Sequence, residues 1–245
     1  MNDLFWKIHS NNRREGPGSE KTTKLALDIT RPFLKKDPKV LDIACGTGAA
    51  STVLAKELDT KILCMESHQP FLDQLKEKAK NEGLEDKIIT KNGKFEDLKD
   101  MKERFDLIWC EGAIYIPGVE KGLSLFKNVL SENGIIAFSD AVFLKDVVSQ
   151  ECRDFWSEGY PTMTTISDNI TKIEQAGLRI IGCFAEPPSA WEEYYIDIQD
   201  KIDRFRIEFK DNKEAQDYLD EEEYEINIFK KYKDEYSYCF FICRK

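Results

Sequence analysis

The sequence predicts an α/β fold in which helices cover both faces of a mostly parallel sheet of seven strands. Short apolar, β-branched runs alternate with segments of helical periodicity, and this alternation is typical of βαβ units with right-handed crossovers. A glycine turn, Gly46-Thr47-Gly48, follows the first apolar run. The last apolar run ends the chain and can join the sheet as a hairpin partner, which predicts an antiparallel last strand. Such a fold is Rossmann-like.

Each strand and helix is predicted from its own segment. The strands are expected in KVLDIA, KILCMES, KIITKNG, FDLIWCEG, GIIAFSDAVF, LRIIGCFAE and YSYCFFICRK. The helices are expected in SEKTTKLALDIT, AASTVLAKEL, PFLDQLKEKAKNEG, VEKGLSLFKNVLSENG and Ser167–Ala176. Ser19 is a natural N-cap for the first helix, and Pro70 opens the third, which closes near Gly83. The fourth helix should stop at Asn133-Gly134.

The chain reads as one domain, residues 1–245, with two segments that do not fit the sheet pattern. These segments are residues 145–165 and 187–234, and both are rich in charged and aromatic residues. A chain of 245 residues can bury a sizeable core without metal or disulfide staples. We therefore expect both segments to be helical insertions above the sheet edge that holds the ligand.

The charge of the chain excludes some partners. Its 36 Lys and Arg against 46 Asp and Glu give a net charge of −10, and residues 186–235 alone hold 17 acidic and 8 basic side chains. A nucleic-acid-binding protein usually needs a basic face. No apolar run is long enough to span a membrane and no signal-peptide core opens the chain, so a cytoplasmic protein with reduced thiols is expected. The seven cysteines lack the pairing or the histidine cluster of a metal site.

The glycine turn and two acids indicate the ligand class. Gly46 and Gly48 lie between a strand and a helix, where backbone N–H groups face the ligand crevice of an open α/β sheet. Glu66 stands 20 positions beyond Gly46, a spacing that suits a carboxylate on a ribose diol. The third glycine of a dinucleotide motif is absent, since Ser51 stands there. Asp42 in the first strand would repel a pyrophosphate but suit a cationic ligand, which favours S-adenosylmethionine.

Longer motifs carry a family resemblance. VLDIACGTG resembles the first motif of the class I S-adenosylmethionine-dependent methyltransferases, and FDLIWCEGAIYIPGVEKGL with NVLSENGIIAFSD resembles their fourth and fifth strands. REGPGS, ESHQPFLDQL and CEGAIYIPGVEKGL are similar to a bacterial and archaeal group of small-molecule-type methyltransferases. GKFEDL resembles the adenine-edge motif, although Lys94 stands where most relatives have an acid. The cofactor-binding residues that the resemblance implies are Asp42, Ala44, Gly46, Thr47, Gly48, Glu66, Ser67, Lys94, Phe95, Glu96 and Glu111.

The resemblance also implies where methyl transfer would take place. Residues 1–30 would form an N-terminal lid, and the insertions at 145–165 and 187–234 a cap over the acceptor side. The candidate catalytic residues are Glu111, Tyr115 and His9. The candidate substrate contacts are Arg14, Tyr115, Trp156, Tyr160 and Trp191. A general base is needed only if the acceptor is protonated at neutral pH.

Several residues keep two interpretations. Arg14 is either solvated or close to a carboxylate, and His68 either packs on adenosine or caps the helix that Pro70 opens. The aromatic residues of the insertions form either their own hydrophobic core or the walls of an acceptor pocket. The acidic stretch at 186–235 is either a solvated helical face or a cover that favours neutral or cationic acceptors over phosphorylated ones.

The function predicted from these motifs is S-adenosylmethionine-dependent methyl transfer to a small-molecule acceptor by in-line displacement at the methyl carbon. One alternative is an S-adenosylmethionine-binding protein without transfer activity, and a second is a nicotinamide-dependent oxidoreductase. The expected partner is a small-molecule methyl acceptor, with no nucleic acid, no membrane and no metal. The oligomeric state stays open, with a homodimer among the options.

Overall fold

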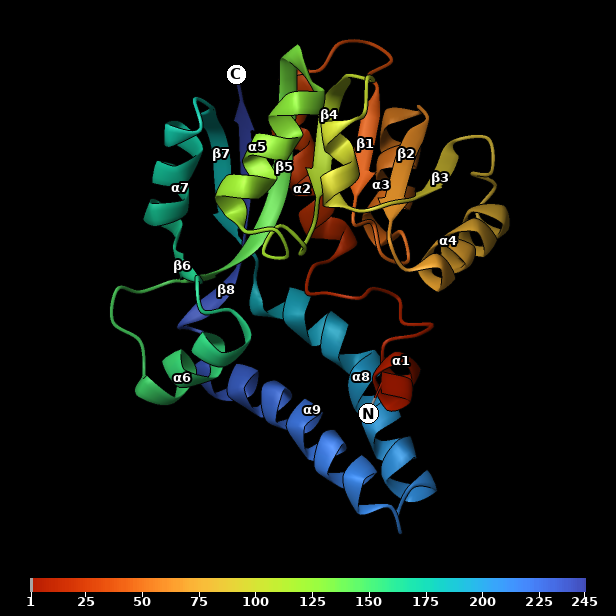
Figure 1. The fold of residues 1–245 in the computed structure, drawn as a ribbon, viewed down its shortest axis with the longest axis vertical. Coiled ribbons are helices and arrows are strands. Elements are labelled where there is room, and N and C mark those ends of the chain that lie inside the picture. Colours follow the sequence, from red (N-terminus) through yellow and green to blue (C-terminus); the bar gives the residue numbers. More distant parts are fainter. Residues whose placement is uncertain (1) are drawn as a thin grey trace.

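The computed structural model describes residues 2–245 and shows one large sheet with helices on both faces (Figure 1). The strands run in the order β3-β2-β1-β4-β5-β8-β7, and the short β6 pairs with β5. The strands are β1 Val40–Ile43, β2 Ile62–Glu66, β3 Ile88–Asn92, β4 Phe105–Cys110, β5 Leu130–Phe143, β6 Thr164–Thr165, β7 Arg179–Ala185 and β8 Tyr236–Arg244. The helices are α1 Asn2–Ile8, α2 Glu20–Thr30, α3 Ala49–Leu58, α4 Gln69–Asn81, α5 Val119–Val129, α6 Gln150–Gly159, α7 Ile166–Gln175, α8 Pro188–Glu208 and α9 Lys213–Tyr232, with 3₁₀ turns η1 Arg31–Phe33 and η2 Phe95–Lys99.

The predicted fold class is confirmed. β1 to β5 pair in parallel, and β8 lies between β5 and β7 and is antiparallel to both. All residues of β8 except Arg244 are buried. A strand covered on both faces needs a continuous apolar run rather than alternation, and the segment YSYCFFICR supplies one. One face of the sheet packs on α2, α3 and α4, and the other on α5, α7 and η2.

Local sequence signals start the helices that lead into the site. Ser19 caps α2 through a capping box with Thr22, whose N–H donates to Ser19 Oγ at 3.1 Å. Gly48 precedes α3 with a φ of 78°. A Cβ on Gly48 would lie 2.1 Å from Leu75 Cδ1, so the close packing of the turn on α4 requires glycine there.

The end of α5 differs from the prediction. The helix stops at Val129, and β5 begins at once with Leu130, so the expected stop at Asn133-Gly134 is wrong. Leu130 is buried and pairs with Phe105 ahead of a register shift in the β4–β5 ladder. A Cβ on Gly134 would lie 2.9 Å from the Phe105 carbonyl oxygen. Asn133-Gly134 therefore lies in the irregular part of the β4–β5 pairing and does not mark a helix end.

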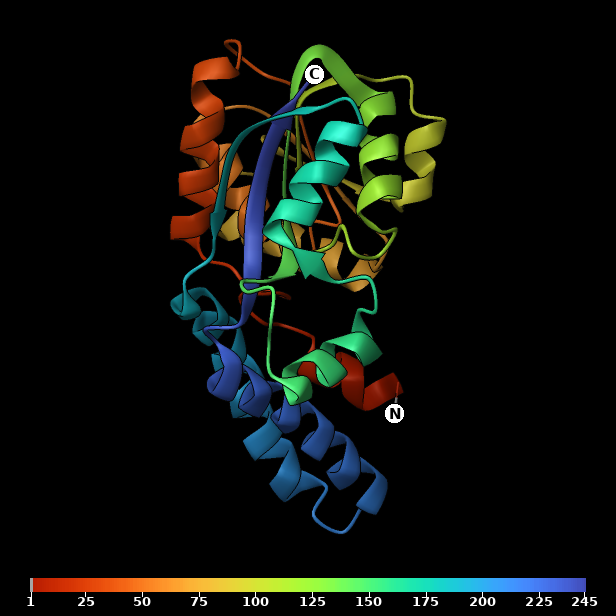
Figure 2. The same cartoon turned by 90° about the vertical axis from the view of Figure 1, so that its left-hand side faces the viewer.

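The helices outside the sheet form a second body beyond the carboxyl ends of its parallel strands. Figures 1 and 2 show α8 and α9 running side by side away from the sheet, with α6 and α1 against them. Their apolar faces make a separate core, in which Trp191 stacks on Phe229 with ring centroids 5.3 Å apart. Lys201 Nζ ties α8 to the end of α1 by donating to the Ile8 carbonyl at 2.9 Å. No helix among residues 2–245 combines the length and apolarity that crossing a membrane requires.

Candidate functional site

A cavity of about 220 Å³, here called the cofactor cavity, opens where β1, β2 and β4 end. The turn after β1, the acid that ends β2, the loop after β4 and an irregular N-terminal segment, residues 14–17, enclose it. Its lining residues are Arg14, Glu15, Gly16, Pro17, Asp42, Ala44, Cys45, Gly46, Thr47, Ala49, Ala50, Glu66, Phe71, Glu111, Gly112, Ala113, Tyr115 and Ile116. The crevice outside the carboxyl ends of parallel strands is the usual ligand position in such sheets.

Glu66 is held at the edge of the cofactor cavity by three donors. Its carboxylate accepts hydrogen bonds from the Gly46 N–H at 3.2 Å, the His68 N–H at 2.8 Å and Ser67 Oγ at 3.2 Å. The side chain is 9% exposed, so a buried acceptor faces the cavity at a fixed position. A ribose diol presents the hydroxyl donors that such a carboxylate accepts.

Asp42 lies beneath the glycine turn and is 1% exposed. Burial raises the pKa of Asp42 to about 8, although the hydrogen bond from Ser51 Oγ at 2.5 Å opposes the shift. A cation bound nearby would favour the ionised form of the carboxyl group. Thr47 Oγ1, also in the cavity wall, is buried without a hydrogen-bond partner in the described chain. These polar groups match a ligand with both a positive charge and polar substituents.

Glu111, which directly follows β4, anchors the N-terminal segment over the cavity. Its carboxylate forms an ion pair with Arg14 and accepts hydrogen bonds from Thr23 Oγ1 and Trp109 Nε1, both at 3.1 Å. The two charged side chains are only 7% and 11% exposed. Arg14 Nε also donates to the Gly16 carbonyl at 2.8 Å, which fixes the bend of the segment.

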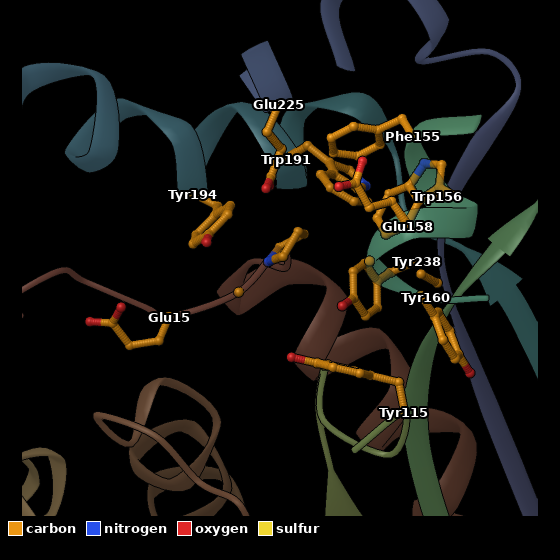
Figure 3. A pocket seen from close by; sticks show the side chains of 15 residues that line it. Glu15, Tyr115, Phe155, Trp156, Glu158, Tyr160, Trp191, Tyr194, Glu225 and Tyr238 are labelled. Atoms are coloured by element: carbon orange, nitrogen blue, oxygen red, sulfur yellow. The ribbon is translucent and has the colours of Figure 1, made fainter. Parts of the chain in front are cut away.

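A second cavity of about 400 Å³, here called the aromatic cavity, adjoins the first (Figure 3). The sheet side, α6, α8, α9 and the N-terminal segment supply its walls. Its lining residues are Glu15, Gly16, Pro17, Gly112, Tyr115, Ala141, Phe155, Trp156, Glu158, Gly159, Tyr160, Trp191, Tyr194, Glu225 and Tyr238. Residues 15–17, Gly112 and Tyr115 line both cavities, so ligands in the two spaces would meet across this shared wall.

The tyrosine hydroxyls around the aromatic cavity differ in whether they have a hydrogen-bond partner. Tyr160 donates to the Asp140 carboxylate at 3.2 Å and is thereby directed away from the cavity. Tyr194 and Tyr238 are 8% and 7% exposed, and in the described chain their hydroxyls have no hydrogen-bond partner. Figure 3 shows both side chains turned toward the enclosed space. Burial, followed by the charge of Glu225, raises the pKa of Tyr194.

The structure brings together part of the residues suggested by the sequence. Six of the implied cofactor residues line the cofactor cavity, namely Asp42, Ala44, Gly46, Thr47, Glu66 and Glu111. Five lie outside it, namely Gly48, Ser67, Lys94, Phe95 and Glu96. Tyr115, Trp156, Tyr160 and Trp191 line the aromatic cavity, whereas Arg14 lines the cofactor cavity. Arg14 is thus close to a carboxylate, which settles the two interpretations of this residue.

The two histidines lie outside both cavities. His68 stacks on Trp6 with ring centroids 3.7 Å apart, and its side chain does not cap α4. His9 lies 3.6 Å from Glu15 and 3.7 Å from Glu222. Burial lowers the pKa of His9, but the two carboxylates outweigh this and raise it to about 9. An imidazole that is protonated at neutral pH does not suit a general base, so the catalytic assignment of His9 stays a prediction without support from its surroundings.

Sequence reasoning missed several lining residues. Glu15, Phe71 and Glu225 were not candidates, and neither was Tyr238 of β8. Tyr194, one of the insertion aromatics with two interpretations, does line the aromatic cavity. It stands three positions after Trp191 on α8, a helical spacing that places both residues on the same face. Glu225 carries no such signal, because it lies within a run of acids that reads as a solvated surface.

Comparisons with known proteins agree with this geometry. Residues 40–134 match the family described as a methyltransferase domain. A crystal structure of an S-adenosylmethionine-dependent methyltransferase from Geobacter sulfurreducens with S-adenosyl-L-homocysteine has a TM-score of 0.83 at 16% identity, over 99% of this chain and 98% of that one. The counterpart from Thiobacillus denitrificans, also with S-adenosyl-L-homocysteine, has a TM-score of 0.83 at 17% identity, over 98% and 97%.

Sequence relatives include named methyltransferases. Methyltransferase GfsG of Streptomyces halstedii is 27% identical over 58% of this chain and 53% of its own length. Sterol 24-C-methyltransferase erg6 of Aspergillus fumigatus is 23% identical over 66% of this chain and 46% of its own length. The chain spans about half the length of these curated relatives. Residues 40–134 thus match a methyltransferase domain, the chain shares its fold with S-adenosylmethionine-dependent methyltransferases solved with S-adenosyl-L-homocysteine, and these findings support S-adenosylmethionine as the cofactor.

Proposed function

We propose that the protein transfers the methyl group of S-adenosylmethionine to a small-molecule acceptor bound in the aromatic cavity. The observation that carries the proposal is the shared wall: residues 15–17, Gly112 and Tyr115 belong to both cavities. A methyl donor in one space and a nucleophile in the other would therefore be neighbours. Holding the two in a reactive orientation is the largest contribution that this chain has to supply.

The residues of the cofactor cavity fit the donor. Glu66 would accept the ribose hydroxyls, and backbone groups of Gly46 and Thr47 would lie along the ligand. Glu111 provides a carboxylate at the end of β4, and Asp42, whose pKa burial raises to about 8, would ionise beside the cationic sulfur. S-adenosylmethionine supplies a methyl group already activated by its positive sulfur. Lys94, Phe95 and Glu96 are proposed for the adenine end, on the strength of the family resemblance alone.

The N-terminal segment is proposed as the cover that excludes water from the reaction. Arg14, fixed by Glu111, holds residues 15–17 across both cavities, and the Gly18 N–H donates to the Ala190 carbonyl at 3.1 Å. This segment therefore joins the sheet to α8 above the site. Excluding water strengthens every electrostatic interaction within the site. The division into a lid at residues 1–30 and a cap at 145–165 and 187–234 is part of this proposal.

Glu111 and Tyr115 remain the proposed groups nearest the reaction. Glu111 already accepts from three donors, which makes it better suited to fixing Arg14 than to taking a proton. Tyr115 lines both cavities and is 43% exposed. Its hydroxyl has room to contact an acceptor, so Tyr115 is proposed to orient the nucleophile.

A second candidate function is cofactor binding without methyl transfer. One solved structure with this fold is described as the [4+2]-cyclase SpnF, with a TM-score of 0.75 at 15% identity. A shared fold does not fix the reaction, so this alternative must be tested directly. A nicotinamide-dependent oxidoreductase is disfavoured by Asp42 beneath the turn and by Ser51 at the third glycine position.

The experiment is incubation of the protein with methyl-labelled S-adenosylmethionine and pools of small metabolites, followed by mass spectrometry. Methyl transfer predicts that S-adenosylhomocysteine and one labelled small molecule accumulate together, in the presence of one pool and not of the others. S-adenosylhomocysteine that binds tightly while no pool is methylated would favour the second candidate function.

A further inference from the structure

We infer that the acceptor is an amine whose nitrogen is cationic in the methylated product, with the Glu225 carboxylate as its counter-charge in the aromatic cavity. This inference rests on the methyl transfer proposed above and names the class of acceptor.

The charges around the aromatic cavity all have one sign. Glu15, Glu158 and Glu225 line it, and no Lys, Arg or His stands among its lining residues in the described chain. Glu15 already has a basic neighbour, because its Oε2 lies 3.6 Å from His9 Nδ1. Glu158 is exposed to solvent. Glu225 is the charge that remains for a ligand.

Glu225 lines the cavity among its aromatic residues and is partly buried. It belongs to α9, accepts a hydrogen bond from the Tyr195 hydroxyl at 3.0 Å, and has no ion pair in the described chain. Its carboxylate points into the cavity beside Trp191 (Figure 3). Burial raises the pKa of Glu225, and the charge of Glu222 adds to the shift. A partly buried carboxylate that lacks an ion-pair partner is stabilised by a cationic ligand.

The walls suit the same kind of ligand. Seven aromatic residues line the cavity: Tyr115, Phe155, Trp156, Tyr160, Trp191, Tyr194 and Tyr238. Trp156 and Trp191 stand nearly perpendicular, at 79° with centroids 6.3 Å apart, so one ring presents a face where the other presents an edge. Aromatic faces attract ammonium groups, and most strongly where water is excluded. The unpartnered hydroxyls of Tyr194 and Tyr238 are available to a polar substituent of the acceptor.

The charge pattern also excludes a class of acceptors. A phosphorylated or carboxylated molecule would bring negative charge next to Glu15, Glu158 and Glu225 with no basic side chain among the cavity's described lining to neutralise it. Burying an unpaired charge near like charges is costly. Anionic acceptors should therefore bind more weakly than neutral or cationic ones.

Methylation of an amine moves positive charge into the aromatic cavity, where the site provides negative charge. The lone pair of a neutral amine nitrogen forms the new nitrogen–carbon bond, while the carbon–sulfur bond breaks and leaves its electron pair on sulfur. The positive charge thus passes from sulfur to the nitrogen, where Glu225 and the ring faces stabilise it as it develops. An amine that enters protonated first loses its proton to water, so the Glu225 carboxylate stays ionised while the new nitrogen–carbon bond forms.

The test measures binding of three probes of similar size to the protein saturated with S-adenosylhomocysteine. The probes are benzyltrimethylammonium, benzyl alcohol and benzylphosphonate, which carry positive, zero and negative charge. Titration calorimetry should give the cation an affinity about tenfold above that of the alcohol, with the phosphonate weakest. Glu225→Gln keeps the shape of the side chain and should remove most of that advantage while leaving benzyl alcohol within about twofold.

Glu221→Gln is the matched control, because Glu221 lies on the same helix but is exposed and lines neither cavity. It should leave all three affinities unchanged. Equal binding of the three probes, no binding of the cation, or equal effects of the two variants would overturn the inference. Binding of S-adenosylhomocysteine in the same samples separates the two proposals. A wild-type protein that does not bind S-adenosylhomocysteine contradicts the proposed function. A wild-type protein that binds S-adenosylhomocysteine but shows no preference among the three probes contradicts only the assignment of an amine.

Discussion

Substitutions of two adjacent arginines, Arg13 and Arg14, at the start of the N-terminal segment should differ sharply in their effect on the free energy of unfolding. Arg14 and its partner Glu111 are 11% and 7% exposed, whereas Arg13 is 61% exposed and pairs with Asp197 at the surface. Arg14→Met removes the cation and leaves the Glu111 carboxylate buried without a countercharge. Arg13→Met removes a pair that water already screens.

The expected magnitudes follow from this difference in burial. Removing one partner of a buried ion pair costs about 3–5 kcal/mol. Thr23 and Trp109 still donate to Glu111 in the variant, so we expect a loss near the lower end, about 3 kcal/mol. An exposed pair contributes about 0–1 kcal/mol, which is the loss expected for Arg13→Met.

Urea unfolding, followed by tryptophan fluorescence and by circular dichroism, measures both free energies of unfolding. The double variant Arg14→Met/Glu111→Gln should be no less stable than Arg14→Met, because the neutral amide no longer leaves a buried charge unpaired. If Arg14→Met and Arg13→Met lower the free energy of unfolding by the same amount within about 0.5 kcal/mol, Glu111 does not hold the N-terminal segment in the way that the structure indicates.

Two further variants test other parts of the site. Glu66→Gln should weaken S-adenosylhomocysteine binding by about 10- to 100-fold, which is what hydrogen bonds to a charged acceptor contribute. Substitution of an exposed acid, Glu85→Gln, should leave the affinity unchanged. Titration calorimetry measures both affinities, and equal values for the two variants would contradict the ribose role of Glu66. His9→Gln should reduce the dependence of the free energy of unfolding on pH. Because the pKa of His9 is raised to about 9 in the folded protein, its positive charge stabilises the fold fully below about pH 6.5, and this stabilisation is lost as pH rises through 9. Unfolding curves between pH 6 and 10 measure this, and an unchanged slope in His9→Gln would refute the contribution of its two carboxylate neighbours.

The sheet could be predicted well because its signals are local. The apolar runs, the Ser19 cap and the glycine turn at Gly48 each specify structure within a few residues, and each is found where expected. The end of α5 could not be predicted in the same way. The position of Asn133-Gly134 depends on how β5 pairs with Phe105, and such pairing joins segments that are distant in sequence.

The candidate site was predicted in part for the same reason. Glu66 and the turn at Gly46 belong to one βαβ unit, so their spacing alone indicates a shared ligand. The ion pair of Arg14 with Glu111 joins residues 97 positions apart, and no local pattern pairs them. Glu225 was hidden by composition, because a run of acids reads as a solvated face until the helix packing shows which member turns inward.

The most direct test of the central claim compares S-adenosylhomocysteine with NAD as ligands of the unmodified protein. Both are titrated under the same conditions by calorimetry, with thermal unfolding as a second readout. A methyltransferase domain with its cofactor above Gly46 and Glu66 predicts saturable binding and a raised melting temperature with S-adenosylhomocysteine, and neither effect with NAD. Binding of NAD without binding of S-adenosylhomocysteine would contradict the account.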